Sequence, residues 1–188
     1  MARVREFDTD QVLAAAVTTF RQHGFAGTSV QNLVEATGIG RGSLYAAFGD
    51  KEGLYLAALD RYRADFAQPL LALLDSEEPP LRLVREILVG LVDEIVQDGT
   101  RQACLIVSAA TELVARDTAV ASRVRETTDL LEETLTTLLR RVDPPLADPR
   151  AAARFVITVV QGLRVAGAVR PERGWLMSSV DLAVRALA

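Results

Sequence analysis

The sequence is poor in the residues from which most catalytic and metal centres are built. Its 188 residues include one cysteine, Cys104, and one histidine, His23. A single cysteine excludes an internal disulfide bond, and one histidine beside it makes a His/Cys metal site very improbable. A Ser-His-Asp triad would have to recruit His23 from the end of the first expected helix. We therefore expect no cofactor, no metal and no enzyme activity. The alternative is a small all-α enzyme. An acid/base or metal cluster would support that alternative, and no such cluster is visible in the sequence.

Long apolar runs and a signal segment are also missing. No run of 18 or more apolar residues occurs, and the nearest candidate, residues 155–169, carries Gln161 and Arg164. The N-terminus carries charged residues within its first eight positions and lacks the apolar core of a secretory signal. With the single cysteine, these features lead us to expect a cytoplasmic protein that does not enter a membrane.

Lysine is the scarcest charged residue. Of 21 basic residues, Lys51 is the only lysine, and residues 1–51 carry five basic and five acidic residues. A DNA-binding module is often basic overall. The net charge therefore gives no support for DNA binding, and any such function must depend on where the charges lie.

Helical periodicity runs through almost the whole chain. Asp8 has the residue type and position of an N-cap, and Asp148-Pro149 combines an N-cap with proline at the first helical position. Residues 156–160 are strand-like by composition, but no second strand exists for them to pair with, so we expect a helix there. The sequence predicts an all-α fold of about nine helices, near residues 8–24, 28–38, 40–47, 50–74, 81–96, 101–115, 120–142, 149–169 and 175–187.

Residues 28–48 are the most informative segment. Thr28 and Gln31 have the spacing of a capping box that opens a helix, and Gly38 supplies the left-handed residue that ends it. A short helix then follows from about residue 40. A helix, a glycine turn and a short second helix are the layout of a helix-turn-helix DNA-binding motif.

The short second helix has the residues that a recognition helix needs. Small or polar residues at its leading end let the backbone enter the major groove, and an arginine there can donate a bidentate pair to guanine. Helix N-termini attract phosphates, which suggests Thr28 and Ser29 at one helix and Lys51 at another; the alternative for Lys51 is a solvated surface charge. The predicted DNA-binding residues are Thr28, Ser29, Gly40, Arg41, Gly42, Ser43, Tyr45 and Lys51.

Residues 8–54 resemble the N-terminal domain of the TetR family of bacterial transcriptional regulators. The resemblance is carried by Gly24-Phe25, Thr28-Ser29-Val30, Ala36-Thr37-Gly38-Ile39, Gly42-Ser43-Leu44-Tyr45, Phe48 and Lys51-Glu52 with Leu54. It implies a homodimer that represses transcription from a palindromic double-stranded DNA operator and is released by a small-molecule effector. It also implies a helix-turn-helix domain over residues 1–49 and a ligand-binding and dimerisation domain over residues 50–188.

The sequence departs from the family pattern at three positions. Ala47 stands where the family often has histidine, Val34 where a small residue is usual, and Gly40 where serine usually opens the third helix. These departures change the expected set of DNA contacts. An interaction protein that has lost operator binding is therefore the second alternative.

Candidate effector-binding residues are polar or bulky side chains in otherwise apolar helices. They are Tyr62, Phe66, Cys104, Ser108, Thr111, Gln161, Arg164, Trp175 and Met177. The alternative is that most of them are ordinary core or surface residues, and Cys104 is more often a small buried residue than a redox sensor. Small residues gather in the last two helices, which favours a homodimer formed through them over a tightly packed monomer.

Overall fold

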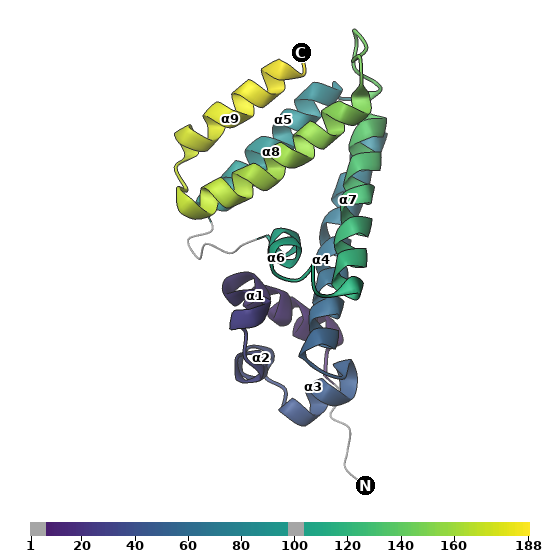
Figure 1. The fold of residues 1–188 in the computed structure, drawn as a ribbon. Helices are drawn as coiled ribbons and strands as arrows, with labels where there is room; N and C mark the ends of the chain where they lie inside the picture. The colour runs from purple at the N-terminus through teal and green to yellow at the C-terminus, as the bar shows by residue number, and fades with distance from the viewer. Residues whose placement is uncertain (1–6, 98–103) are drawn as a thin grey trace. The chain divides into compact units, whose positions relative to one another are not determined.

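The computed structural model describes residues 7–97 and 104–188, and in these residues it contains helices and turns but no strand. The helices (Figure 1) are α1 (Thr9–Gly27), α2 (Val30–Thr37), α3 (Arg41–Phe48), α4 (Lys51–Ala72), the 3₁₀ helix η1 (Leu73–Asp75), α5 (Pro80–Gln97), α6 (Leu105–Glu112), α7 (Thr118–Leu139), α8 (Pro149–Val169) and α9 (Arg173–Ala186). The predicted all-α fold is confirmed. The helix expected over 101–115 ends earlier, at Glu112, and its first three residues lie outside the described residues.

Local capping signals set several helix ends as the sequence predicts. The Asp8 carboxylate accepts from the N–H of Asp10 at 2.9 Å and so caps α1. Gly38 closes α2 with a φ of 69°, a left-handed conformation that favours glycine. Asp148 accepts from the first backbone N–H groups of α8, with Pro149 following it. Residues 156–160 are helical, within α8.

The capping box of α2 lies one residue later than predicted. The Ser29 hydroxyl accepts from the N–H of Asn32 at 3.1 Å, and the Asn32 side chain accepts from the N–H of Ser29 at 2.9 Å. Thr28 is instead buried, and its hydroxyl donates to the carbonyl of Gly24 at 2.6 Å. The prediction of a Thr28–Gln31 box is therefore wrong, because burial of the threonine methyl group decides between two adjacent candidates.

The described residues form two compact units. The first unit is residues 7–65 and 104–125, and it includes α1, α2, α3, most of α4, α6 and the start of α7. In it, α1 packs against α2 and α6, and α2 packs against α3. Its core contains Phe20, Leu33, Leu44, Tyr55 and Leu59. Packing therefore divides the chain differently from the functional division expected at residues 49 and 50, which stays a prediction.

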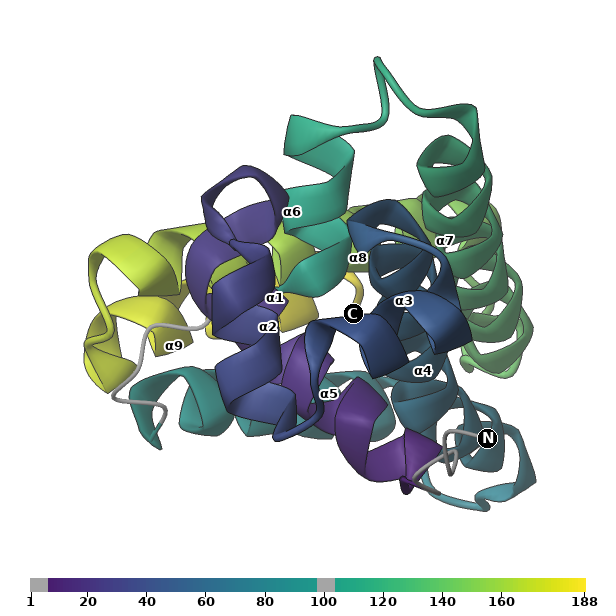
Figure 2. The same ribbon diagram turned by 90° about the horizontal axis from the view of Figure 1, so that it is seen from below.

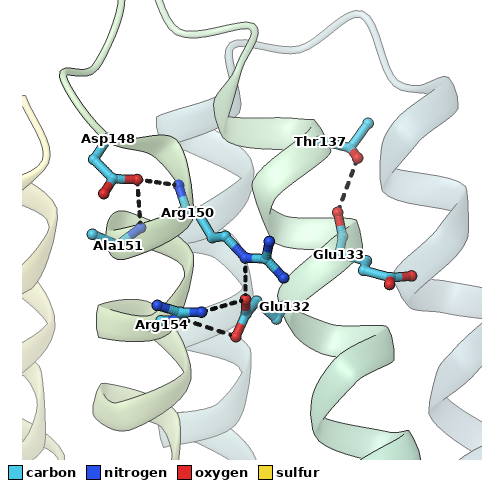
Figure 3. Close-up of polar contacts among 7 residues, drawn as sticks. All are labelled: Glu132, Glu133, Thr137, Asp148, Arg150, Ala151 and Arg154. Carbon is cyan, nitrogen blue, oxygen red and sulfur yellow. Dashed lines mark hydrogen bonds and ion pairs between the residues drawn. The ribbon is translucent and has the colours of Figure 1, made fainter.

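The second unit is residues 66–97 and 126–188. In it α5, α8 and α9 lie side by side (Figure 1). Figure 3 shows how the polar edge of α7 meets α8: the Glu132 carboxylate lies between the guanidinium groups of Arg150 and Arg154, with Arg154 Nε at 3.0 Å. Hydrogen bonds from these two arginines lower the pKa of Glu132 below its ordinary value.

The α8 helix keeps an apolar face that the single chain leaves exposed. By length and composition it is the one helix, within residues 7–97 and 104–188, that could cross a bilayer. Of its most apolar 18-residue stretch, 28% is buried within the single chain. It packs on α5 and α9, and its Arg164 pairs with Glu94 of α5 at 3.3 Å. Phe155, Val165 and Val169 are large exposed apolar residues of this helix. Their spacing places them on one side of the helix, which is typical of a helix that packs against another apolar surface.

Candidate DNA-binding surface

The segment predicted as a helix-turn-helix has that geometry. Two eight-residue helices, α2 and α3, are joined by a turn at Gly38, and they pack against each other. Leu33 and Leu44 hold the two helices to the core of the first unit. Seen from below, α2 and α3 lie on the near side of the first unit (Figure 2).

The leading end of α3 is exposed and carries little bulk. Gly40, Arg41 and Gly42 are all exposed, and Gly40 caps the helix without a side chain. A Cβ atom placed on Gly40 or Gly42 would meet nothing within 4 Å. The first N–H groups of an α-helix have no acceptor within the helix. This end of α3 therefore presents backbone donors and the positive pole of the helix dipole to solvent or to a bound anion.

Arg41 and Tyr45 form a pair on the exposed side of α3. The guanidinium carbon of Arg41 lies over the Tyr45 ring, 5.2 Å from its centroid. Residues four apart on a helix are neighbours, and a ring beneath a guanidinium restricts its motion while leaving its edge free to donate. Ser43 lies between them in sequence and is partly buried. The pair thus holds a fork of N–H donors at the start of the helix.

The expected anchors at the start of α2 differ in detail from the prediction. Thr28 is 1% exposed, and its hydroxyl donates to the carbonyl of Gly24 within the protein. Ser29 is exposed. The N–H groups that lack an acceptor within α2 are those of Val30 and Gln31. Phosphate binding at the N-terminus of α2 by Thr28 and Ser29 stays a prediction.

Lys51 is partly buried in the first unit, and its ammonium group binds protein atoms rather than being a fully solvated charge. Its ammonium group donates to the carbonyl of Phe25 at 3.0 Å and to that of Thr28 at 3.1 Å. It also lies 4.1 Å from the centroid of the Phe25 ring. Two of its three protons are therefore engaged with the connection between α1 and α2. A phosphate contact by the remaining proton stays a prediction.

Comparison with known proteins identifies the family. Residues 12–58 match the family described as "Bacterial regulatory proteins, tetR family", and residues 80–187 match "BetI-type transcriptional repressor, C-terminal". The chain is 32% identical over 169 residues to the HTH-type transcriptional repressor ComR of Escherichia coli K12, a match that spans 87% of this chain and 80% of ComR. The chain belongs to the TetR family. It is a transcriptional regulator of that family.

Two further relatives share the likeness to this TetR-family regulator over most of its length. The HTH-type transcriptional repressor BdcR of Escherichia coli K12 is 31% identical over 163 residues, which are 86% of this chain and 79% of BdcR. A cysteine mutant of the TetR-family regulator CifR, solved with 26-base-pair double-strand operator DNA, is 33% identical, with a TM-score of 0.85. That match covers 98% of this chain and 99% of CifR.

The predicted effector-binding residues of the regulator fall in both compact units. Tyr62, Cys104, Ser108 and Thr111 belong to the first, and Phe66, Gln161, Arg164, Trp175 and Met177 belong to the second. The structure brings Tyr62 and Cys104 together, with the tyrosine hydroxyl 3.7 Å from the sulfur. Thr111 is exposed and donates its hydroxyl to the carbonyls of its own helix.

In the second unit the predicted effector-binding residues have varied surroundings. Gln161 and Trp175 are exposed, and the Trp175 ring lies under the guanidinium of Arg170. Arg164 is paired with Glu94, and Met177 packs against the core of this unit. A common effector pocket for the nine residues stays a prediction.

The sequence does not single out Glu112, and it does not predict the contacts that Phe25 of the family motif makes. Phe25 packs between the ring of Tyr55 and the ammonium of Lys51, and its backbone N–H donates one hydrogen bond to the Glu112 carboxylate. Burial raises the pKa of the Tyr55 phenol well above its ordinary value, and the Glu112 carboxylate raises it further. The phenol therefore stays neutral. No spacing in the sequence indicates a contact between residues 25 and 112.

Proposed function

We propose that the protein is a homodimeric repressor that binds a palindromic operator and is released by a small molecule. The exposed leading end of α3 is the observation that carries this proposal. Gly40 and Gly42 give the backbone room to enter a major groove, and Arg41 is the one cation at that end. Arg41 reads guanine through two N–H donors, while Ser43 and Tyr45 bind phosphate or base edges.

A second copy of the chain docks on α8 and α9. Phe155, Val165 and Val169 are exposed on α8, and Trp175 and Leu182 are exposed on α9, seven residues apart and so on one side of the helix. Since α8 and α9 pack against each other, these residues supply the apolar half of a two-fold four-helix bundle. The two copies of α3 then enter the major groove about 34–36 Å apart, one turn of DNA.

The effector acts by preferring the released form of the dimer. To move the protein from nearly all bound to nearly all released, it must bind the released form about 5.5 kcal/mol more tightly, summed over both subunits. Tyr62 and Cys104, which lie together in the first unit, are the best-supported of the predicted effector contacts. Such a regulator acts in the cytoplasm and has no enzyme activity of its own.

A binding assay on genomic DNA tests the proposal. Purified protein should shift a small number of genomic fragments in a gel at nanomolar concentration and physiological salt. The Arg41→Ala variant is the control, and it should lose the selectivity among fragments before it loses all binding. Binding to no fragment by the wild-type protein would instead favour an interaction protein that has lost operator binding. The neutral charge balance of residues 1–51 is the observation that supports this second candidate.

A further inference from the structure

The last residue of α6 holds the backbone that leads into the helix-turn-helix. One oxygen of the Glu112 carboxylate, Oε2, accepts from the N–H of Phe25 at 3.0 Å and from the N–H of Ala26 at 3.2 Å. These two amides lie in the connecting segment, residues 24–29, between the regular part of α1 and the start of α2. A carboxylate that accepts two backbone N–H groups makes strong, charge-assisted hydrogen bonds.

The connecting segment is built to receive this carboxylate. Gly24 has φ 68° and ψ 178°, a conformation that side-chain-bearing residues rarely adopt. A Cβ atom on Gly24 would lie 2.5 Å from Oε1 of Glu112. The backbone angles favour glycine at this position, and a Cβ atom there would also push the Glu112 carboxylate from its place.

Lys51 holds the same segment by its carbonyls. It donates to the carbonyls of Phe25 and Thr28, so the peptide groups around Phe25 are bound from both their N–H and C=O sides. The Phe25 ring is packed against Tyr55 at 5.0 Å between centroids and against Phe20 at 6.3 Å. The segment is therefore fixed at its backbone and at its one large side chain.

We infer that Glu112 is a positioning residue for operator binding, which acts by setting the backbone from which α2 and α3 start. The segment that it binds ends at Ser29, the N-cap of α2, so a shift of residues 25 and 26 carries α2 with it. Helix α6 lies in the same compact unit as α1, α2 and α3, and it packs directly on α1. A displacement of the end of α6 therefore reaches the start of α2 through the Glu112 carboxylate, in addition to the packing of α6 on α1.

This inference rests on the proposed operator binding. A comparison of four proteins distinguishes a failure of the inference from a failure of the proposed function. The four proteins are the wild type, Glu112→Ala, Glu112→Gln and Glu133→Gln. The Ala variant removes the acceptor, while Gln at position 112 keeps an oxygen that can accept both N–H groups. Glu133 is an exposed glutamate of α7 whose replacement removes the same charge far along the chain. Fluorescence anisotropy gives the Kd for the best genomic fragment and for a scrambled duplex, and hydrogen exchange gives the opening of the Phe25 and Ala26 amides.

We expect Glu112→Ala to weaken operator binding about tenfold and scrambled-duplex binding less than twofold. Exchange at the Phe25 and Ala26 amides should rise at least tenfold. Glu112→Gln should recover operator affinity to within about threefold of wild type, and Glu133→Gln should match wild type. A merely structural role would lower both kinds of DNA binding together by reducing the folded fraction, which circular dichroism reports.

If Glu112→Ala opens the two amides yet binds the operator as tightly as wild type, the inference is overturned and the proposed function stands. If the wild type selects no fragment, the proposed function falls first, and the inference falls with it. Should Glu112→Ala fail to fold, Glu112→Asp replaces it, because the shorter side chain keeps the charge but cannot reach both amides. It should lose operator affinity at least threefold, and a wild-type value would overturn the inference.

Discussion

Replacement of Lys51 by methionine tests the finding that this residue stabilises the connection between α1 and α2. Methionine keeps the apolar stem but removes the ammonium group that donates to the carbonyls of Phe25 and Thr28. A hydrogen bond to a charged group contributes about 1.5–3 kcal/mol. Both carbonyls lie in a partly exposed segment, where water replaces part of the loss. Contact between the methionine sulfur and the Phe25 ring offsets the lost cation–π interaction. We therefore expect a loss of about 2 kcal/mol in the free energy of unfolding.

That loss is measurable by thermal unfolding. In a chain of this size 1 kcal/mol corresponds to about 2–4 °C in Tm, so Lys51→Met should unfold about 4–8 °C below wild type. The matched control is Arg116→Met, which removes an exposed cation from the same compact unit. It should change the free energy of unfolding by less than about 0.5 kcal/mol. Equal Tm values for Lys51→Met and Arg116→Met would refute the internal role.

The salt dependence of operator binding then decides whether Lys51 has a second role. If the third proton of its ammonium group binds a phosphate, the slope of log K against log salt should fall by about 0.9 in Lys51→Met. An unchanged slope beside a lowered Tm would mean that Lys51 stabilises the fold and makes no phosphate contact.

Further predictions concern the recognition helix, the ion cluster and the subunit contact. Arg41→Ala should cost about 1–3 kcal/mol of operator binding and relax one base position per half-site in a sequence-selection assay. Tyr45→Phe removes the hydroxyl but keeps the ring beneath Arg41, so the base preference that Arg41 provides should remain, whereas Tyr45→Ala should lose it. Equal base preferences in the two variants would show that the ring does not orient Arg41. The pKa of Glu132 is lowered, so its stabilising effect is complete above the ordinary pKa of glutamate and fades as the pH falls through the lowered value. Glu132→Gln should therefore be less stable than wild type at pH 7, and the difference in urea midpoint should close in acid. Leu182→Arg should yield folded monomers by light scattering, and a dimer of wild-type strength would place the contact elsewhere.

Features that depend on neighbours in sequence could be read from the sequence. Asp8, Gly38 and Asp148 act at the helix ends where their residue types predict them, because caps and left-handed turns are local chemistry. The strand-like run 156–160 is helical, as the sequence predicts, because a lone strand has nothing to pair with. Arg41 is exposed, as the sequence predicts for a charged residue at the leading end of the short helix.

Features that depend on tertiary packing could not be read in this way. Thr28–Gln31 and Ser29–Asn32 are equally good capping boxes by spacing, and only the burial of Thr28 selects the second. Lys51 has the position of a phosphate contact, but the carbonyls that it binds lie more than twenty residues away. The bond between Glu112 and Phe25 joins residues 87 apart, and no local pattern signals it.

The distance between the two recognition helices on DNA tests the central claim most directly. The sole cysteine, Cys104, can be replaced by serine, and a spin label can be attached at Ala46→Cys on the exposed side of α3. Double electron–electron resonance on the operator complex should give one narrow distance near 34–36 Å, within the reach of the labels. A broad distribution, or no intermolecular distance at all, would contradict the account of paired recognition helices in successive major grooves.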